Sequence, residues 1–166
     1  MKKYIGALFL LITTSLFTTS CNKNKDASYL RGQLDGEHFE CSSTVRANQP
    51  ERIPGLGDDP TLRITAEWPS YSLKLVLITG GSIGKGTYPF ELGKDRSAQM
   101  WQNSTDSYYA GNSCIICPSQ LYGSGSITIN EITKKYVKGT FEFTAVNSFS
   151  SITKTVTNGE FSVGRE

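Results

Sequence analysis

The chain has 166 residues, of which 19% are charged and 37% belong to the apolar set, and its formal net charge is +2. This length suits one ordinary domain, or at most two small ones. The charge balance excludes a typical nucleic-acid-binding domain, whose basic patch raises the isoelectric point above about 9, so we expect no nucleic-acid partner.

Residues 1–20 have the layout of a secretory signal peptide. Lys2 and Lys3 give a basic start, residues 4–12 are almost wholly apolar, and small polar residues follow. The apolar run is far shorter than the roughly 20 residues that a transmembrane helix needs. Because the two lysines are the only charges in this segment, the rest of the chain carries fifteen basic and fifteen acidic residues and has no net charge. Net charge therefore indicates no partner for the domain that follows.

The segment ends in Phe17-Thr18-Thr19-Ser20-Cys21, which resembles the lipobox of bacterial lipoprotein signals. Thr18 stands where leucine is most common, although the looser boxes of Bacteroidota-type lipoproteins accept such changes. The resemblance implies that Cys21 is lipidated on its sulfur and holds the mature protein in a membrane by several acyl chains. The alternative is ordinary secretion, with Cys21 free or bridged. Asn22, rather than an aspartate, follows Cys21, and its resemblance to the enterobacterial sorting rule implies no retention at the inner membrane, so we expect the outer membrane. Residues 21–27 would then be the lipidated cysteine and a solvated tether.

Residues 28–166 show the pattern of one β domain, because period-two alternation recurs and no 3.6-residue apolar period persists. Leu30 and Leu34 precede the turn dipeptide Asp35-Gly36, and Phe39 and Cys41 follow it, which predicts a hairpin.

The next strands follow in the middle of the chain. Apolar residues alternate with polar ones over residues 62–68, and Pro69-Ser70 ends the run. Residues 73–79 are apolar on both faces except for Lys74, which predicts a strand near the middle of a sheet. Gly86-Thr87-Tyr88 opens another short segment.

The C-terminal third alternates most regularly, over residues 126–130 and 137–145 and again around Val156, Phe161 and Val163. Asn158-Gly159 predicts a bulge or a turn. Strands with one apolar face must stack or close to hide it. We therefore expect an all-β fold, a single antiparallel β-sandwich or lipocalin-like barrel of about eight or nine strands. Residues 46–60 and 103–123 are expected to be irregular, and loops of that length are candidate functional surfaces.

Several motifs together resemble one family. They are the Asp35-Gly36 hairpin, the Gly86-Thr87-Tyr88 segment, and residues 125–129, 137–143 and 156–161. In this combination they resemble the uncharacterised lipoprotein-anchored β domains common in Bacteroidota, most strongly over residues 124–163. The resemblance implies a cell-envelope lipoprotein of unknown activity, and it supplies no catalytic residues.

Three cysteines remain if Cys21 carries lipid. An exported chain meets an oxidising compartment, so one disulfide is expected among Cys41, Cys114 and Cys117, and each of the three pairings is open. A bond from Cys41 to either of the others closes far more chain than a bond between Cys114 and Cys117, and loop-closure entropy favours it by on the order of 1 kcal/mol. Buried or free thiols are the alternative.

His38-x-x-Cys41 and Cys114-x-x-Cys117 together have the composition of a structural zinc site. An offset of three residues, however, sends His38 and Cys41 to opposite faces of a strand. We therefore expect no metal ion and no cofactor. No helix pattern follows Cys114 to activate a redox thiol, and no glycine-flanked serine accompanies His38, so we assign no catalytic residue.

Aromatic residues flank the loop that holds Cys114 and Cys117, namely Trp101, Tyr108, Tyr109 and Tyr122. Such rings stack on sugars or apolar ligands, so these residues are candidates to face a ligand. The alternative is that Trp101 and one of the two adjacent tyrosines pack in the core.

The leading hypothesis is a lipid-anchored protein of the cell envelope, in the outer membrane, whose domain binds or supports another molecule without catalysis. Its partners would be the membrane, through the lipid, and a glycan, a small apolar ligand or another envelope protein. One alternative is a lipocalin-like carrier of a small apolar ligand, which requires an open cavity behind Ile127, Ile129, Phe141 and Phe143. The other is an envelope hydrolase acting on glycans or peptides, which requires two carboxylates that converge in a cleft.

Overall fold

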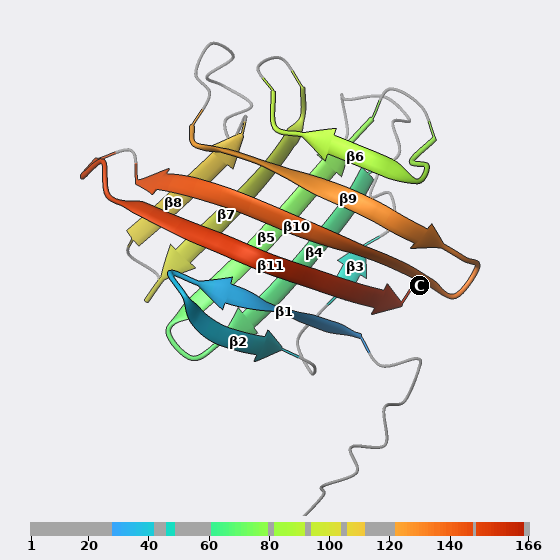
Figure 1. Ribbon diagram of the computed structural model, residues 1–166, viewed down its shortest axis with the longest axis horizontal. Helices are drawn as coiled ribbons and strands as arrows, with labels where there is room; N and C mark the ends of the chain where they lie inside the picture. The colour runs from blue at the N-terminus through green and yellow to red at the C-terminus, as the bar shows by residue number, and fades with distance from the viewer. Residues whose placement is uncertain are drawn as a thin grey trace, which may run out of the picture.

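A computed structural model describes residues 28–41, 46–48, 61–79, 82–91, 94–103, 106–111, 122–147 and 149–164 (Figure 1). Within these ranges the chain forms eleven β-strands and no helix. The strands are β1 (Tyr29–Leu34), β2 (Glu37–Cys41), β3 (Arg46–Asn48), β4 (Thr61–Trp68), β5 (Tyr71–Ile78), β6 (Gly86–Pro89), β7 (Arg96–Gln102), β8 (Asp106–Gly111), β9 (Ser124–Ile132), β10 (Tyr136–Asn147) and β11 (Thr153–Gly164). All of their pairings are antiparallel, which confirms the predicted all-β class.

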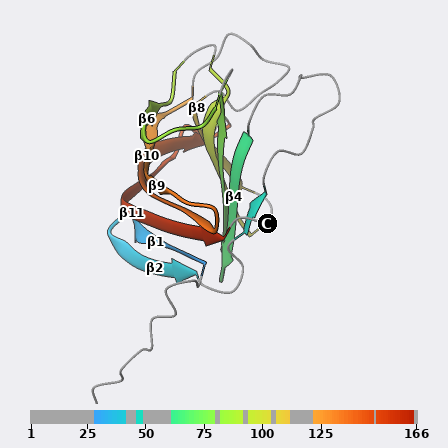
Figure 2. The same cartoon turned by 90° about the vertical axis from the view of Figure 1, so that its right-hand side faces the viewer.

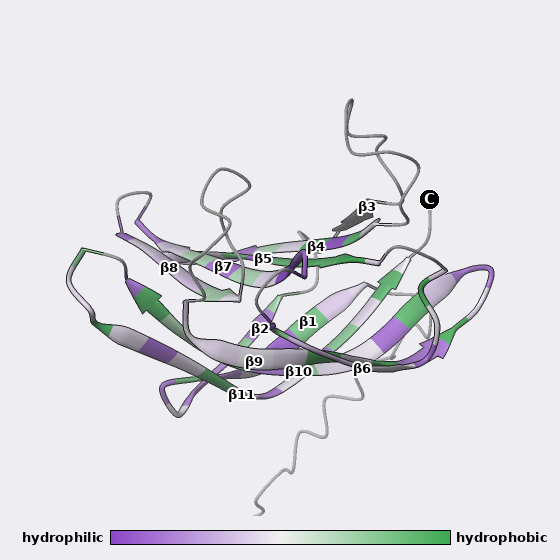
Figure 3. Ribbon diagram, turned by 90° about the horizontal axis from the view of Figure 1, so that it is seen from above, coloured by the Kyte–Doolittle hydropathy of each residue, from purple (hydrophilic) through white to green (hydrophobic). Residues whose placement is uncertain are grey.

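The strands form one sheet that folds into two facing layers (Figures 2 and 3). The first layer has the order β2-β1-β11-β10-β9-β6, and the second has the order β8-β7-β5-β4-β3. The layers are joined where the last residues of β10, Val146 and Asn147, pair with Tyr109 and Tyr108 of β8. On the opposite side β2 lies beside β4, and no pairing is described between them. The sheet is thus nearly closed and barrel-like, with a seam between β2 and β4.

The predicted Asp35-Gly36 hairpin is confirmed, and Pro69-Ser70, predicted only to end a strand, forms the turn of a second hairpin. Asp35 and Gly36 both have positive φ angles, 51° and 90°, and join β1 to β2 in a two-residue turn. Pro69 and Ser70 join β4 to β5, with Ser70 at φ 73°. β5 lies between β4 and β7, as its apolar residues predicted.

The structure has more strands than the sequence pattern indicated. Residues 46–48 and 106–111 form β3 and β8 although both lie in segments expected to be irregular, and β7 was not predicted. β8 was missed because serine, alanine and glycine occupy half of it and weaken its apolar alternation. In β7 the adjacent Ser97 and Ala98 are both buried, which interrupts the alternation there.

A β-bulge interrupts β11 at Asn158, which has φ 52°, and Gly159. In the pairing with β10, Phe141 lies opposite Gly159 but Phe143 lies opposite Val156. The pairing with β1 steps at the same place. The bulge predicted as one of two options for Asn158-Gly159 is confirmed, and both neighbours of β11 accommodate the same extra residue.

Phenylalanine rings of the first layer lie opposite glycines of the neighbouring strands. Because glycine has no side chain, a ring directly across the ladder can lie flat over the backbone of the next strand. The four cross-strand pairs are Phe39 with Gly32, Phe161 with Gly139, Phe141 with Gly159, and Phe143 with Gly125. A Cβ added at Gly139 would lie 2.5 Å from Phe161 Cζ and would overlap the carbonyl oxygen of Thr128.

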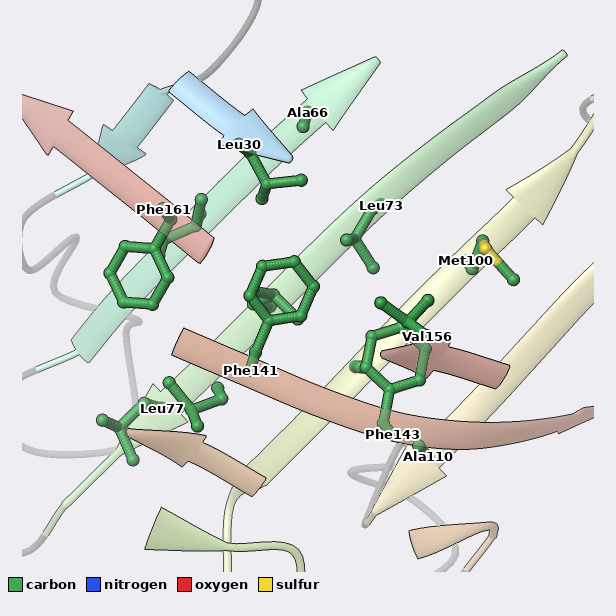
Figure 4. Packing of buried hydrophobic residues seen from close by; sticks show 14 of the residues in the cluster. Leu30, Ala66, Leu73, Leu77, Met100, Ala110, Phe141, Phe143, Val156 and Phe161 are labelled. Atoms are coloured by element: carbon green, nitrogen blue, oxygen red, sulfur yellow. The ribbon is translucent and has the colours of Figure 1, made fainter. Parts of the chain in front are cut away.

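The space between the layers is filled by side chains from both (Figure 4). Phe141 and Phe143, with ring centroids 6.2 Å apart, face Leu73 and Met100 of the second layer. The four residues expected to border a lipocalin-like cavity, Ile127, Ile129, Phe141 and Phe143, are all buried in this single cluster.

We predict that Gly139→Ala destabilises the protein by about 2 kcal/mol or more, because the new methyl group must displace the Phe161 ring or the backbone of β9. Gly84→Ala is the matched control, since a Cβ there meets nothing within 4 Å, and it should change the free energy of unfolding by less than about 0.5 kcal/mol. Urea unfolding of the purified full chain measures both. Equal stabilities of the two variants would contradict the ring-on-glycine packing.

Candidate functional site

A groove with a volume of about 620 Å³ lies at the seam between β2 and the turn that joins β4 to β5. Its size falls within the range of small-ligand and peptide pockets. The β1–β2 hairpin, the β4–β5 turn and the start of β11 line it, through Leu34, Asp35, Glu37, His38, Phe39, Glu40, Trp68, Pro69, Ser70, Tyr71 and Lys154.

Three aromatic rings hold this seam together. The Phe39 ring stacks on Trp68 with centroids 4.7 Å apart and planes 8° from parallel. Trp68 stacks in turn on Tyr71, its cross-strand partner around the β4–β5 turn, at 5.7 Å. Phe39 is buried, whereas Trp68 and Tyr71 are half-buried, so the seam has an apolar floor that reaches the surface.

Asp35 connects the hairpin turn to β11. Its carboxylate accepts hydrogen bonds from the Thr155 backbone N–H at 2.8 Å and from Lys154 Nζ at 2.9 Å. Burial by itself would raise the pKa of Asp35, but the Thr155 hydrogen bond and the bond and charge of Lys154 outweigh it and hold the pKa below its ordinary value. The hydrogen bond to Asp35 also raises the pKa of Lys154. Both groups are therefore ionised at pH 7, and together they carry no net charge.

The acidic side of the groove is bordered by three residues of β2, namely Glu37, His38 and Glu40. His38 and Glu40 share the outer face of the strand, with His38 Nε2 4.0 Å from Glu40 Oε2 and both side chains more than half exposed. Glu37 has the same parity along β2 as the buried Phe39 and Cys41. Residues from both faces of β2 thus line one groove, which means that the groove follows the edge of the strand.

A smaller pocket of about 360 Å³ adjoins the groove on the outer surface of the second layer. The two cavities share Ser70 and Tyr71 in their linings. The rest of the smaller pocket is lined by Glu67, Ser72 and two residues of the β7–β8 hairpin, Trp101 and Asn103. The predicted candidate Trp101 therefore lies close to the groove, on the outer face of β7 opposite Ser72, whereas Tyr71 has the inner-face parity of the buried Leu73.

A third depression, of about 370 Å³, lies on the outer face of the first layer. A row of polar side chains crosses six strands there, one residue from each, in direct register. These are Thr87, Thr128, Thr140, Glu160, Arg31 and Glu40. Arg31 donates from Nε and Nη2 to Glu160 Oε2 at 3.0 and 2.6 Å, so the row is largely paired within itself.

The other aromatic candidates are separated by the strand alternation. Tyr108 points into the core and is only 4% exposed, so it does not face a ligand. Its neighbour Tyr109 points outward and lies 6.1 Å from Tyr122, centroid to centroid. Of the four residues, only Trp101 lines one of the cavities described above.

Cys41 is buried on the inner face of β2, and its predicted partners Cys114 and Cys117 lie outside the described residues, as does Cys21. As a thiol, Cys41 has its pKa raised to about 11 by burial and by the charge of Glu40, so it is protonated and unreactive at neutral pH. His38 and Cys41 lie on opposite faces of an uninterrupted β2, as their spacing predicted.

Sequence reasoning did not find the seam. Two aromatic residues that bracket a Pro-Ser turn, Trp68 and Tyr71, were the one local signal of an exposed aromatic surface. Among the described residues, no three His, Cys, Asp or Glu side chains gather as metal ligands would, and no helix is long and apolar enough to cross a membrane.

A family model described as a domain of unknown function, DUF6252, matches residues 26–164. No curated protein and no solved structure matches the chain.

We predict a pH-dependent loss of stability in Asp35→Asn. Asparagine suits a positive-φ turn position before glycine, so this change mainly removes the charge that pairs with Lys154. Because the pKa of Asp35 is lowered in the folded protein, the ionised group stabilises above its ordinary pKa of about 4, and this contribution is lost as pH falls through the lowered value. The exposure of the pair limits the loss at pH 7 to about 1 kcal/mol or less.

Urea unfolding at pH 7 and at pH 3 measures this difference. Lys154→Gln is the matched control, because it should cost a similar amount at pH 7 in the parent and little in the Asp35→Asn background. A difference between Asp35→Asn and the parent that persists undiminished at pH 3 would contradict the assignment.

Proposed function

We propose that this chain, which belongs to the DUF6252 family of domains of unknown function, is a lipid-anchored protein of the cell envelope whose β domain binds a ligand and catalyses no reaction. The basic, apolar and small-residue layout of residues 1–20 and the lipobox-like residues before Cys21 support the anchor. Asn22 after Cys21, by the enterobacterial sorting rule, supports the outer membrane as its place.

The observation that carries the binding function is the groove at the seam. It combines a partly exposed aromatic stack, Phe39-Trp68-Tyr71, with charged groups at its rim, as ligand sites do. The Asp35–Lys154 pair fixes the hairpin against β11, so one wall of the groove is held before any ligand arrives.

A short tether would join the β domain to a lipid on Cys21. The domain begins beside the end of β11, where the Gly164 backbone N–H donates to Ser28 Oγ at 3.0 Å. Asp35, which follows the other end of β1, lines the groove. Residues 22–27, fully extended, would span about 20 Å. A lipid on Cys21 would therefore keep Ser28 within about 20 Å of the bilayer.

A hydrolase is the second candidate, because three carboxylates and a histidine line the groove. Its geometry is less favourable than that of a binding site. Asp35 is engaged by Lys154 and Thr155, and strand alternation sends Glu37 and Glu40 to opposite faces of β2. Two carboxylates acting on one bond must instead converge on it. A lipocalin-like carrier is not favoured, because the core cluster occupies the space its ligand would need.

We predict that Cys21→Ala abolishes the incorporation of palmitate into the protein and releases it from the membrane fraction, because the acylated sulfur is removed. Metabolic labelling of cells that produce the full chain, followed by fractionation, measures both. Cys114→Ala is the matched control and should keep both the label and the membrane location. A label that persists in Cys21→Ala would contradict the anchor.

We predict that a photoreactive phenylalanine analogue at position 37 captures a ligand in living cells, because Glu37 lines the groove. The same analogue at Lys134, in the exposed turn between β9 and β10, is the control and should give no adduct. Gel mobility and mass spectrometry of the irradiated full chain identify the adduct as protein, glycan or small molecule. Absent adducts at position 37, or equal yields at both positions, would contradict the binding function.

A further inference from the structure

We propose that the free edge of β2 binds an extended, basic peptide segment of a partner protein, which adds to the first layer as a further strand. This inference rests on the proposed binding function and names its ligand class. Among the described strands, β2 pairs with β1 alone, so its second edge is available to another strand.

The turn at Asp35-Gly36 determines which backbone groups point to that edge. In a two-residue hairpin the flanking residues, here Leu34 and Glu37, form a hydrogen-bonded pair, and such pairs recur at every second position. The backbone groups of Glu37, Phe39 and Cys41 therefore point to β1, and those of His38 and Glu40 point away from it. An added strand would find two N–H donors and two carbonyl acceptors there.

The groove itself follows this edge. Glu37 and Phe39 border it from one face of β2, and His38 and Glu40 border it from the other. A cavity over a sheet face would touch only one of these two sets. The backbone edge of β2 thus opens into a space of about 620 Å³, with Trp68 on the far side.

The charges beside the edge favour a cationic segment. Lys154 pairs with Asp35, and Arg31, which lies opposite Glu40, pairs with Glu160, so the carboxylates of Glu37 and Glu40 are left at the groove with His38 beside Glu40. Two negative charges attract lysine and arginine side chains and repel a second copy of the same strand. The edge carries no lysine, proline or bulge, and its protection against self-association is the charge of Glu37 and Glu40 on a strand of only five residues.

The two faces of the added strand would meet different surroundings. Side chains on its inner face would lie over Phe39 and Trp68, and those on its outer face would lie beside His38 and Glu40. The segment should therefore alternate apolar and basic residues. Its short contact along Glu37–Glu40 suits three or four peptide residues.

The test measures binding of a labelled peptide to the detergent-solubilised full chain by fluorescence anisotropy. The probe is Lys-Val-Arg-Val-Lys-Val with capped ends. We expect saturable binding that weakens about tenfold or more in Glu40→Lys, because the charge beside the strand is reversed. The same peptide methylated on every backbone nitrogen keeps its charge but cannot pair, and it should not bind.

His38→Pro and His38→Ala form the matched variants. Proline removes the outward N–H, and its ring occupies the edge without breaking the ladder to β1, whereas alanine removes only the imidazole. We expect His38→Pro to lose binding by about tenfold or more and His38→Ala to keep it. Equal urea midpoints of the two variants verify that both are folded.

Equal binding by His38→Pro and His38→Ala, or by the methylated and unmethylated peptides, would overturn strand addition. A glucosamine hexamer serves as a cationic glycan, and if it binds while the peptide does not, the inference fails and the proposed binding function stands. If the full chain does not bind the peptide but forms dimers, and His38→Pro abolishes these dimers, the edge of β2 binds a second copy of this chain and the inference is overturned. Failure of the binding function itself is recognised separately, by the absence of adducts at position 37 in cells.

Discussion

Phenylalanine rings lying over cross-strand glycines are the constraint on which the first layer depends. The rings of Phe39, Phe161 and Phe141 occupy the space that a Cβ would take at Gly32, Gly139 and Gly159, and Gly125 gives the same clearance to the Cα and Cβ of Phe143. With the rings flat on the sheet, the second layer can approach closely and fill the remaining space with leucine and methionine side chains. The same arrangement turns Phe39 toward Trp68, and this contact brings together the two borders of a sheet that does not fully close.

The candidate site is a product of that incomplete closure. A fully closed barrel has no edge, and a sandwich has edges that are far from one another. Here the edge strand β2 stands beside the β4–β5 turn, with aromatic contact at depth and acidic side chains at the rim. Structural support and exposed acidic side chains thus come from the same short hairpin. A neutral domain can in this way present a locally acidic surface, which its net charge does not reveal.

The strands that bury one face were predictable, because burial on one side imposes alternation on the sequence. β4, β10 and the β1–β2 hairpin follow this rule residue by residue. β7 and β8 were not predicted, because some of their buried positions hold small residues, Ser97, Ala98 and Ala110, which give little apolar alternation in the sequence. The groove could not be predicted, since Asp35 meets Lys154 from 119 positions away and Phe39 meets Trp68 across unpaired strands. Such contacts arise from closure of the sheet, which no local pattern encodes.

The bulge in β11 also fixes the alignment of three strands. The pairings of β1 and β10 with β11 both shift register at Asn158 and Gly159. A displacement of either strand along β11 by one or two residues would therefore place a regularly paired stretch opposite the extra residue. The chain therefore has one register in which both β1 and β10 pair with β11 along their length. Thr157 and Asn158 both lie on the outer face, between the inward-facing Val156 and Gly159, so loss of one of them would restore a regular strand, whereas loss of a residue elsewhere in β11 would turn the side chains on one side of it to the opposite face. A deletion of one residue in β11 should accordingly be tolerated at the bulge and not in the regular stretches on either side of it.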